Sequence, residues 1–405
     1  MYKTKPFMIS KYAVLEAYER IKANRGTYGV DEQSIGDFEK DRNNNLYKIW
    51  NRMSSGTYFP KPVKAVEIPK KNGRTRILGI PTIEDRVAQM VAKIYFEPEV
   101  EKVFNKDSYG YRPNKSAIQA IGVTRERCWK RRWILEYDIK ALFDNINHER
   151  LIEMVEKHTD EKWIKLYVKR WLKAPFKMKD GTIVERTAGT PQGGVISPVL
   201  ANLYMHYVCD DFMRKEFPYI PWVRYADDGV VHCESLKQAK DIKKRLEKRL
   251  RKYGLELNQD KTRIVYCKND DGNEGCENKK FDFLGYTFRH RKAMDKKGKA
   301  FTSFLPAISD KAKKEIRKKV NSWKIQLKTD KSIYDIAKML NSKIRGWINY
   351  YGYYYKTEMD KVLKYIDLKL IKWVKRVYRK STTRAVDWLK NIAKVKPKLF
   401  VHWKF

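Results

Sequence analysis

The fold is decided by the stretch Val223-Arg224-Tyr225-Ala226-Asp227-Asp228-Gly229-Val230-Val231, in which two adjacent carboxylates stand between short apolar runs. This pattern predicts a β-hairpin that carries the acids at its tip. An Asp-Asp pair alone more often marks an ordinary turn. The case for a functional site therefore depends on what else the chain brings to this hairpin.

A second apolar stretch, upstream of the hairpin, ends on a single acid: Trp133-Ile134-Leu135-Glu136-Tyr137-Asp138-Ile139. If this strand pairs with the hairpin, Asp138 lies beside Asp227 and Asp228. Three carboxylates in one small space repel each other unless cations neutralise them, and hard divalent cations prefer carboxylate oxygens. Two Mg²⁺ ions about 3.5–4 Å apart are the arrangement that supports phosphoryl transfer.

Composition narrows the class of protein. The chain has 405 residues, enough for two or three subdomains, and 88 basic against 49 acidic residues give a net charge of +39. Such an excess indicates a polyanionic partner. A merely basic or ribosome-associated protein is the alternative, but the acidic cluster favours a nucleic-acid enzyme.

The sequence also argues against a membrane or secreted protein. It has no run of about 20 apolar residues, which a membrane helix needs, and its first residues lack the apolar segment of a signal peptide. Its five cysteines are odd in number and none are in C-x-x-C spacing, which indicates a reducing compartment without a disulfide framework or zinc site.

Three motifs in order resemble the reverse transcriptase signature set, namely Asp138-Ile139-Lys140-Ala141-Leu142-Phe143-Asp144-Asn145-Ile146, Thr190-Pro191-Gln192-Gly193-Gly194-Val195-Ile196-Ser197-Pro198 and Tyr225-Ala226-Asp227-Asp228. Nearly the whole chain resembles group II intron-encoded reverse transcriptases, also called maturases. Neither a C-terminal DNA-binding region nor a His-Asn-His endonuclease is recognisable. The resemblance is therefore to the compact, endonuclease-lacking, group IIC-like kind.

The resemblance implies an α+β fold with the right-hand architecture of polymerases: fingers, a palm with an antiparallel sheet, and a helical thumb. Residues 1–305 would form fingers and palm, with an N-terminal extension over about residues 1–55. From about Ala307 the composition becomes helical, basic and aromatic. Residues 306–405 would accordingly be the thumb, or maturase X domain.

The resemblance assigns catalysis to Asp138, Asp227 and Asp228. It implies that these carboxylates and the backbone carbonyl of Ile139 bind two Mg²⁺ ions, while a primer 3′-hydroxyl attacks the α-phosphate of a nucleotide. Asp228 would support the cluster, although a hairpin turn can instead aim its carboxylate elsewhere.

Further positions match nucleotide-binding residues of the family. Lys70 and Arg76 would hold the triphosphate of the incoming nucleotide. Lys71 remains an alternative to Lys70. The simpler interpretation of these basic residues is a solvated loop. Phe143 would exclude ribonucleotides by shape, unless it is a packed core residue. Gln192 would lie near the templating base and nucleotide, and Lys261 would protonate the pyrophosphate, although it could be a surface lysine.

Other segments are expected to contact nucleic acid. Tyr109 and Arg112 belong to a segment that mixes aromatic and basic residues, as single-strand binding does. The resemblance also assigns a primer-grip hairpin and part of the thumb to this role, although dense aromatics often form a core: Phe283, Leu284, Gly285, Arg345, Trp347 and Tyr350.

The implied function is RNA-directed DNA synthesis from a primer, with intron RNA binding that assists splicing and retrohoming. Its partners would be intron RNA, an RNA template, a DNA primer or target and dNTPs, without a membrane or a required second protein. We expect a cytoplasmic, bacterial protein associated with nucleoid or ribonucleoprotein. The alternative is a domesticated group II-like reverse transcriptase in phage defence or DNA repair.

Periodicity and turn residues predict the individual elements. Helices are expected over 9–23, 36–53, 82–96 with Thr82 as N-cap, 116–130, 149–171, 235–253, 311–327, 333–347 and 359–378. Another helix should start at Ser197 as N-cap with Pro198 in its first turn. Hairpins are expected over 60–81 and around 179–182, and a strand over 255–258.

Overall fold

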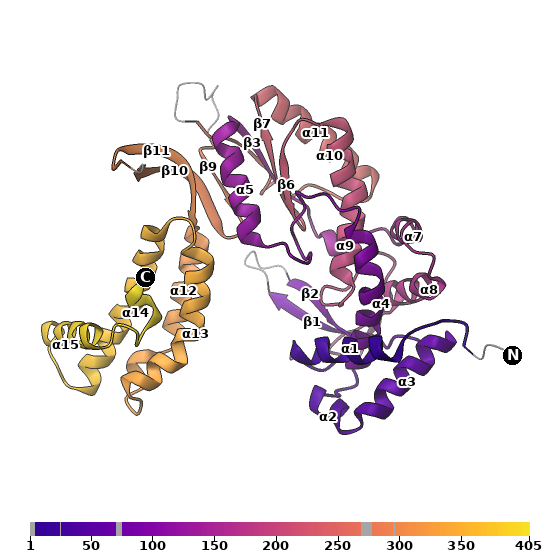
Figure 1. Ribbon diagram of the computed structural model, residues 1–405, viewed down its shortest axis with the longest axis horizontal. Coiled ribbons are helices and arrows are strands. Elements are labelled where there is room, and N and C mark those ends of the chain that lie inside the picture. Colours follow the sequence, from indigo (N-terminus) through magenta and orange to yellow (C-terminus); the bar gives the residue numbers. More distant parts are fainter. Residues whose placement is uncertain (1–4, 25, 70–74, 269–277, 295–296) are drawn as a thin grey trace. The chain divides into compact units, whose positions relative to one another are not determined.

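A computed structural model describes residues 5–24, 26–69, 75–268, 278–294 and 297–405. The chain forms two compact units. Unit 1 comprises residues 1–116, 137–230 and 240–262, and unit 2 comprises residues 117–136, 231–239 and 263–405. The mixture of helices and largely antiparallel sheets makes the fold α+β (Figure 1).

Unit 1 begins with three helices, α1 (Lys11–Ala23), α2 (Ile35–Lys40) and α3 (Arg42–Ser55). The predicted first hairpin is present: β1 (Val63–Pro69) pairs antiparallel with β2 (Thr75–Ile80). Its sheet has the order β2-β1-β4-β5, where β4 (Phe176–Lys177) and β5 (Ile183–Val184) form the second predicted hairpin. As predicted, the Thr82 side chain caps α4 (Ile83–Glu101) by accepting a bond from Asp85 N.

Further helices of unit 1 follow α4 in the sequence. They are α6 (Leu142–Asn145), α7 (His148–Glu156), α8 (Lys162–Lys173), α9 (Ser197–Met205), the π-helix η1 (His206–Asp210) and α10 (Asp211–Glu216). Most of α11 (Leu236–Lys252) also belongs to this unit. Helices α7 and α8 pack together and bury apolar side chains, as their amphipathic patterns require.

A four-stranded sheet carries the acids and has the strand order β6-β7-β3-β8. Its strands are β6 (Trp222–Tyr225), β7 (Asp228–Cys233), β3 (Trp133–Asp138) and β8 (Arg263–Tyr266). The pairing of β7 with β3 confirms the predicted neighbourhood of the two acidic stretches. The chain passes from one unit to the other within β3 and within β7.

Unit 2 combines a second antiparallel sheet with helices. Strands β9 (Lys280–Phe283), β10 (Tyr286–Met294) and β11 (Ala300–Ile308) have the order β11-β10-β9, and α5 (Ala117–Lys130) packs on β11. After β11 the chain is helical: α12 (Asp310–Ser322), η2 (Ile325–Leu327), α13 (Ile333–Tyr351), α14 (Lys356–Val377), α15 (Thr382–Val395) and η3 (Val401–Lys404). In Figure 1 these helices form one orange-to-yellow bundle.

One cluster of aliphatic and aromatic side chains forms the core of this bundle. Trp373 and Ile366 of α14 are fully buried in it, together with Leu340 and Ile344 of α13. The change to a helical composition near Ala307 therefore coincides with the end of the last strand. The boundary predicted at residue 306 falls inside unit 2, so it does not mark the division between the two units.

Several predicted elements differ from those observed. The single helix expected over 36–53 is broken at Asp41 (φ −128°, ψ 43°), and that over 149–171 consists of α7 and α8. Ser197 does not cap α9, because its hydroxyl accepts a bond from Thr190 Oγ1 (2.7 Å) instead. Residues 255–258 form only an isolated bridge, between Leu257 and Ile139, and α15 was missed.

Within the part of the chain that the structure describes, no helix is long and apolar enough to span a bilayer.

Candidate active site

The Asp-Asp hairpin consists of β6 and β7 joined by Ala226 and Asp227. Ala226 has φ 57°, in the left-handed region that costs a residue with a β-carbon about 1 kcal/mol. Asp227 follows this strained residue, and Asp228 is the first residue of β7. The backbone conformation of the turn therefore sets where the two carboxylates point.

Asp138, at the end of β3, is joined to this turn. The next residue, Ile139, donates its N–H to the carbonyl of Asp227 (3.0 Å). The Asp138 carboxylate accepts bonds from Asn258 Nδ2 (2.9 Å) and Lys261 Nζ (2.6 Å), and its side chain is only 8% exposed. The structure thus brings together Asp138, Asp227 and Lys261, which lie far apart in sequence.

The electrostatics confirm that the acids interact. Burial, followed by the negative charges of Asp227 and Asp138, raises the pKa of Asp228 to about 8. Burial and the charge of Asp138 likewise raise the pKa of Asp227. Although burial lowers it, the hydrogen bond and charge of Asp138 raise the pKa of Lys261. One lysine therefore compensates only part of the negative charge.

The oxygen atoms of this cluster suit a hard divalent cation. They belong to buried carboxylates that repel one another and to a backbone carbonyl beside them. Among the described residues, no group of three His, Cys, Asp or Glu side chains is already arranged as a complete metal-binding set. The Asp138 carboxylate is instead bonded to Lys261 and Asn258. A cation at this site would compete with the ammonium group of Lys261 for the same oxygen.

Phe143 lies in α6, which follows the strand that ends on Asp138. It is half-buried, and its ring meets that of Tyr111 edge to face at 6.2 Å between centroids. Tyr111 also lies beside Tyr225 (6.4 Å). Burial, and then the charge of Asp227, raise the pKa of Tyr111. Phe143 therefore belongs to an aromatic group at the edge of the acidic cluster.

Gln192 is held on a loop attached to β2. Its carbonyl accepts a bond from Gly79 N (2.8 Å), and its Nε2 donates to the Asp144 carboxylate (3.2 Å). Gly193 has φ 124°, and a β-carbon there would lie 2.3 Å from the Gly79 carbonyl. The loop therefore needs glycine at this point in order to approach β2 closely.

Arg76 lies exposed on β2, and its positive charge acts on Tyr111. Its charge is thus close enough to lower the pKa of Tyr111, against the larger effect of burial. Lys70 and Lys71 lie outside the described residues.

Tyr109 and Arg112 are the two residues of unit 1 for which we predicted contact with nucleic acid. Both are buried. The Arg112 guanidinium donates to the Glu101 carboxylate (2.8 Å) and to the carbonyls of Asn105 and Ser108 (2.6 and 2.9 Å). These bonds fix Arg112 among neighbouring segments of unit 1, and contact of Tyr109 and Arg112 with nucleic acid stays a prediction.

In unit 2, the predicted primer-grip residues form the turn between β9 and β10. Phe283 is buried, whereas Leu284 (φ 51°) and Gly285 (φ 78°) have the two positive φ values of a tight hairpin turn. Tyr350 donates its hydroxyl to the carbonyl of Leu284 (2.8 Å), and Tyr286 donates to the carbonyl of Tyr350. Helix α13 is thereby bonded directly to this turn.

Two aromatic residues of α13, Trp347 and Tyr350, make packing contacts within unit 2. Trp347 stacks on Trp323 (5.4 Å, 20°), and Tyr350 is committed to the β9–β10 turn. Arg345, by contrast, is exposed. Trp347 packs half-buried against the bundle core and Tyr350 is half-buried at the turn, and contact of these residues with nucleic acid stays a prediction.

Sequence reasoning missed four residues around the acids: Tyr111, Asn202, Asp210 and Asn258. It also gave no role to Arg224. A charged residue inside an apolar strand, three positions before Asp227, was the available signal for Arg224. The partners of these residues could not be identified, because they come from distant segments.

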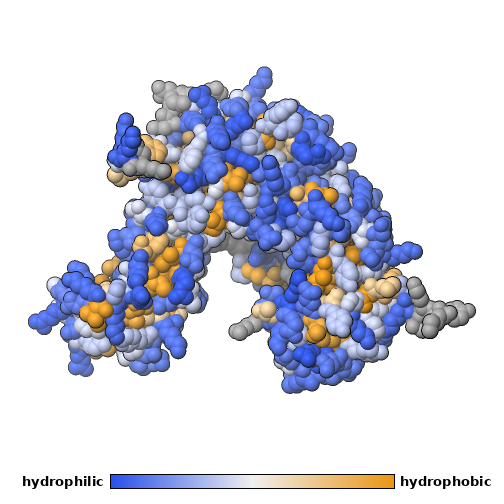
Figure 2. Space-filling model, in the orientation of Figure 1, coloured by the Kyte–Doolittle hydropathy of each residue, from blue (hydrophilic) through white to orange (hydrophobic). Residues whose placement is uncertain are grey.

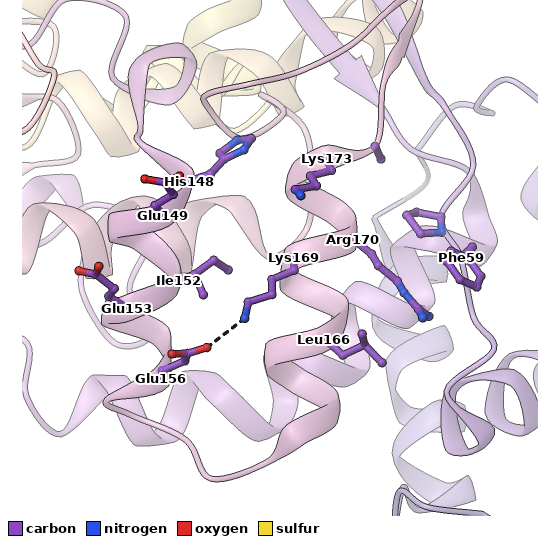
Figure 3. A pocket seen from close by; sticks show the side chains of 12 residues that line it. Phe59, His148, Glu149, Ile152, Glu153, Glu156, Leu166, Lys169, Arg170 and Lys173 are labelled. Atoms are coloured by element: carbon purple, nitrogen blue, oxygen red, sulfur yellow. Dashed lines mark hydrogen bonds and ion pairs between the residues drawn. The ribbon is translucent and has the colours of Figure 1, made fainter.

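A groove of about 740 Å³ lies elsewhere in unit 1, between α7 and α8 (Figure 3). Figure 3 shows Glu156 of α7 and Lys169 of α8 pointing toward each other across the groove, where they form an ion pair (3.1 Å). His148 lines the groove and donates from Nε2 to the carbonyl of Gly189 (2.7 Å). The groove includes none of the three acids.

Comparison with known proteins agrees with this geometry. Residues 68–288 match the family model for reverse transcriptase (RNA-dependent DNA polymerase), and residues 313–390 match the group II intron maturase-specific domain. The chain is 27% identical to the group II intron-encoded protein LtrA of Lactococcus lactis subsp. cremoris, over 83% of this chain and 68% of that protein.

Two other relatives extend the comparison. An uncharacterized 91 kDa protein in the cob intron of Schizosaccharomyces pombe is 26% identical, over 86% of this chain and 50% of its own length. Protein YkfC of Escherichia coli is 29% identical, over 60% of this chain and 70% of its own length. Reverse transcriptases normally use divalent metal ions. The chain belongs to the reverse transcriptase family and is a group II intron-type RNA-directed DNA polymerase that carries a maturase-specific domain.

Proposed function

We propose that Asp138 and Asp227 hold two Mg²⁺ ions for DNA synthesis on an RNA template, with the carbonyl of Ile139 as a further ligand. The observation that carries the proposal is the junction of two distant strands, where Ile139 N–H bonds the carbonyl of Asp227 (3.0 Å) beside the Asp138 carboxylate. When bound, the ions would neutralise the charge of the attacking and leaving oxygens.

In the reaction, the primer 3′ oxygen bonds to the α-phosphorus of a dNTP and pyrophosphate leaves with the α–β bridging oxygen. Lys261 is the proton donor that we assign to the pyrophosphate. Its raised pKa keeps it charged, and its ammonium group already reaches the site by its bond to Asp138. Metal binding to Asp138 would release Lys261 for this role.

Asp228 supports the cluster in this proposal. Its carboxyl group has a pKa of about 8 and hydrogen-bonds Asp138, so without cations it holds a proton between the acids at neutral pH. Bound cations would lower that pKa, because they favour the charged form.

We assign the nucleotide to the surface formed by Phe143, Gln192 and Arg76, with Lys70 added on the strength of the family resemblance alone. Phe143 would stand against the 2′ position of the sugar, supported by the edge of Tyr111. Gln192 is within reach, because its loop is bonded to the strand that bears Arg76.

We also propose that the chain binds intron RNA, assists its splicing and takes part in retrohoming. The maturase-specific match at 313–390 and the net charge of +39 support this proposal. Hydrophilic residues cover most of the face in Figure 2, as a phosphate-binding surface requires. In the right-hand architecture, the helices after β11 would be the thumb, with fingers and palm before them.

Primer extension tests the enzymatic proposal. Wild-type protein with Mg²⁺ and an RNA template should extend a DNA primer with dNTPs, and Asp227→Asn should abolish extension. Asp180→Asn is the matched control, because Asp180 lies in an exposed turn and accepts a hydrogen bond from the neighbouring Thr182 N (3.0 Å). Products made from ribonucleotides alone would contradict the proposed chemistry.

A splicing assay separates the two roles. A protein that carries Asp227→Ala and Asp228→Ala should still promote splicing of its intron RNA, because RNA binding uses other surfaces. If the folded double variant loses both activities, the roles are not separable. A gene without flanking intron sequence, whose product has polymerase activity alone, would favour the domesticated alternative.

A further inference from the structure

Arg224 is a fully buried cation two residues before the catalytic turn. It lies in β6 between apolar neighbours, and its side chain and that of its partner Asp210 are both 0% exposed. Burying such a pair is costly, and replacement by apolar residues is often neutral or stabilising. A stability role alone therefore explains the pair poorly.

All five N–H groups of the Arg224 guanidinium have acceptors. Nε and one N–H of Nη2 bind both oxygens of Asp210 (2.7 and 2.6 Å), and the other N–H of Nη2 binds Ser108 Oγ (2.8 Å). Nη1 donates to Asn202 Oδ1 (3.2 Å) and to the carbonyl of Ala226 (3.1 Å). Only arginine has five donors in one rigid plane.

The bond to Ala226 is the informative one. Ala226 has the left-handed conformation (φ 57°), and its carbonyl belongs to the peptide bond that leads into Asp227. Asn202, which accepts a bond from Arg224, also connects a neighbouring segment to this turn, because its Nδ2 donates to the carbonyl of Gly110 (2.6 Å). A β-carbon on Gly110 would lie 2.5 Å from Ala226 N, so the turn has little space in which to relax.

A local irregularity presents Asp210 to the guanidinium. Asp210 ends the π-helix η1, which interrupts the α-helical course between α9 and α10. One residue added to a helical turn rotates the succeeding side chains by about 100° around the helix axis. The π-turn thus gives Asp210 a direction that an uninterrupted α-helix would not.

We propose that Arg224, oriented by Asp210 and Asn202, is a positioning residue that holds Ala226 in its left-handed conformation and so fixes the Asp227 carboxylate for metal binding. The inference rests on the proposed role of Asp227. It predicts that loss of the guanidinium plane affects turnover and metal affinity, while affinity for the template–primer duplex is unchanged.

Three variants test the inference. Arg224→Lys retains the charge for Asp210 but has only three donors. The double variant Arg224→Met with Asp210→Leu removes both charges, so no unpaired charge stays buried. The control Arg186→Lys changes another largely buried arginine, which donates to the carbonyls of Ala174 and Trp171 (2.6 and 2.5 Å) outside the acidic cluster.

For each variant we would measure kcat, KM for dNTP, the Mg²⁺ concentration at half-maximal rate, the Kd for the template–primer duplex and the melting temperature. Misplacement of a catalytic group costs on the order of 10²-fold in rate, and loss of a ligand's support costs about 10-fold or more in metal affinity. Arg224→Lys should show both losses, with Kd and the KM for dNTP unchanged.

The double variant decides between positioning and stability. If it folds and melts like wild type but remains about 10²-fold slow with weakened Mg²⁺ dependence, the positioning role is supported. If it recovers wild-type kcat and Mg²⁺ dependence, or if Arg186→Lys shifts the Mg²⁺ dependence equally, the inference is wrong. Absence of synthesis by wild-type protein would instead overturn the proposed function.

Discussion

Unit 1 and the helical bundle of unit 2 use buried space differently. Unit 1 buries charged groups: Arg224, Asp210 and Asp138 at the Asp-Asp hairpin, and Asp85 in the first turn of α4. The bundle core is aliphatic and aromatic, while Lys311, Lys314 and Lys318 of α12 are exposed. Buried polar networks fix positions because they are satisfied in only one arrangement, whereas apolar cores tolerate substitution of similar volume. We infer that the buried polar groups of unit 1 fix the positions of the acidic side chains, whereas the apolar core of the bundle stabilises its fold.

The largest expected effect concerns the acids. Asp138→Asn removes the charge that we assign to metal binding, and DNA synthesis should fall by on the order of 10³-fold or more. The free energy of unfolding should change less than the rate, because the amide oxygen can still accept the bond from Asn258, and Lys261, whose side chain is 59% exposed, can turn to solvent. Single-turnover extension and chemical denaturation would measure the two quantities. A variant that loses stability but not rate would reverse the roles described for unit 1.

The second prediction reverses that pattern in the bundle. Trp373 is fully buried and donates to the carbonyl of Lys328 (2.9 Å), so Trp373→Ala should cost about 3–5 kcal/mol of unfolding free energy. Below its melting temperature the variant should retain the kcat of wild type. Trp373→Phe, the milder control, should cost less. An equal loss of kcat in the folded protein would show that bundle packing also sets the catalytic geometry.

The third prediction uses pH to probe unit 1. Burial raises the pKa of Asp85 to about 6 from an ordinary value near 4. Because the folded state binds the proton more tightly, this group's contribution to stability should fall by about 3 kcal/mol as pH rises from 4 to 6. The difference in unfolding free energy between wild type and Asp85→Asn, measured at pH 4 and pH 7, reports it. A difference independent of pH would contradict the prediction.

Glu358 in unit 2 should show the opposite sign. Burial raises the pKa of Glu358. Hydrogen bonds from Lys313 and Lys361 outweigh this effect and lower the pKa to about 2, from an ordinary value of 4.5. Its stabilising contribution should be complete above pH 4.5 and should disappear as pH falls towards 2. Acid titration of Glu358→Gln against wild type measures this. Equal acid sensitivity of the two proteins would show that the ion pairs add nothing.

The smallest effect belongs to the exposed lysines. Each change of Lys311, Lys314 or Lys318 to Ala should reduce the slope of log Kd for RNA against log salt by about 1, if that lysine contacts a phosphate. Lys240→Ala on α11 would show whether unit 1 contributes in the same way. If the slope of log Kd against log salt stays at the wild-type value for all of these variants, the RNA does not contact these lysines.

The acidic cluster was predictable because period-2 patterns and turn residues are local signals. The hairpin, the end of β3 and the bond partner Lys261 all lie where the motifs indicated. The burial of Tyr109 and Arg112 was not predictable, since their partners are fixed only by tertiary packing. For the same reason, the commitment of Tyr350 to the β9–β10 turn could not be read from an aromatic-rich segment.

The passage of the chain between units within β3 has a consequence for synthesis on the ribosome. Residues Trp133–Glu136 pair with β8, in the register Trp133 with Tyr266 and Glu136 with Arg263. The strand that ends on Asp138 therefore lacks this neighbour until residue 266 has left the exit tunnel. A nascent or truncated protein ending at residue 262 would expose an open sheet edge, the kind of surface that chaperones bind and that aggregates form on.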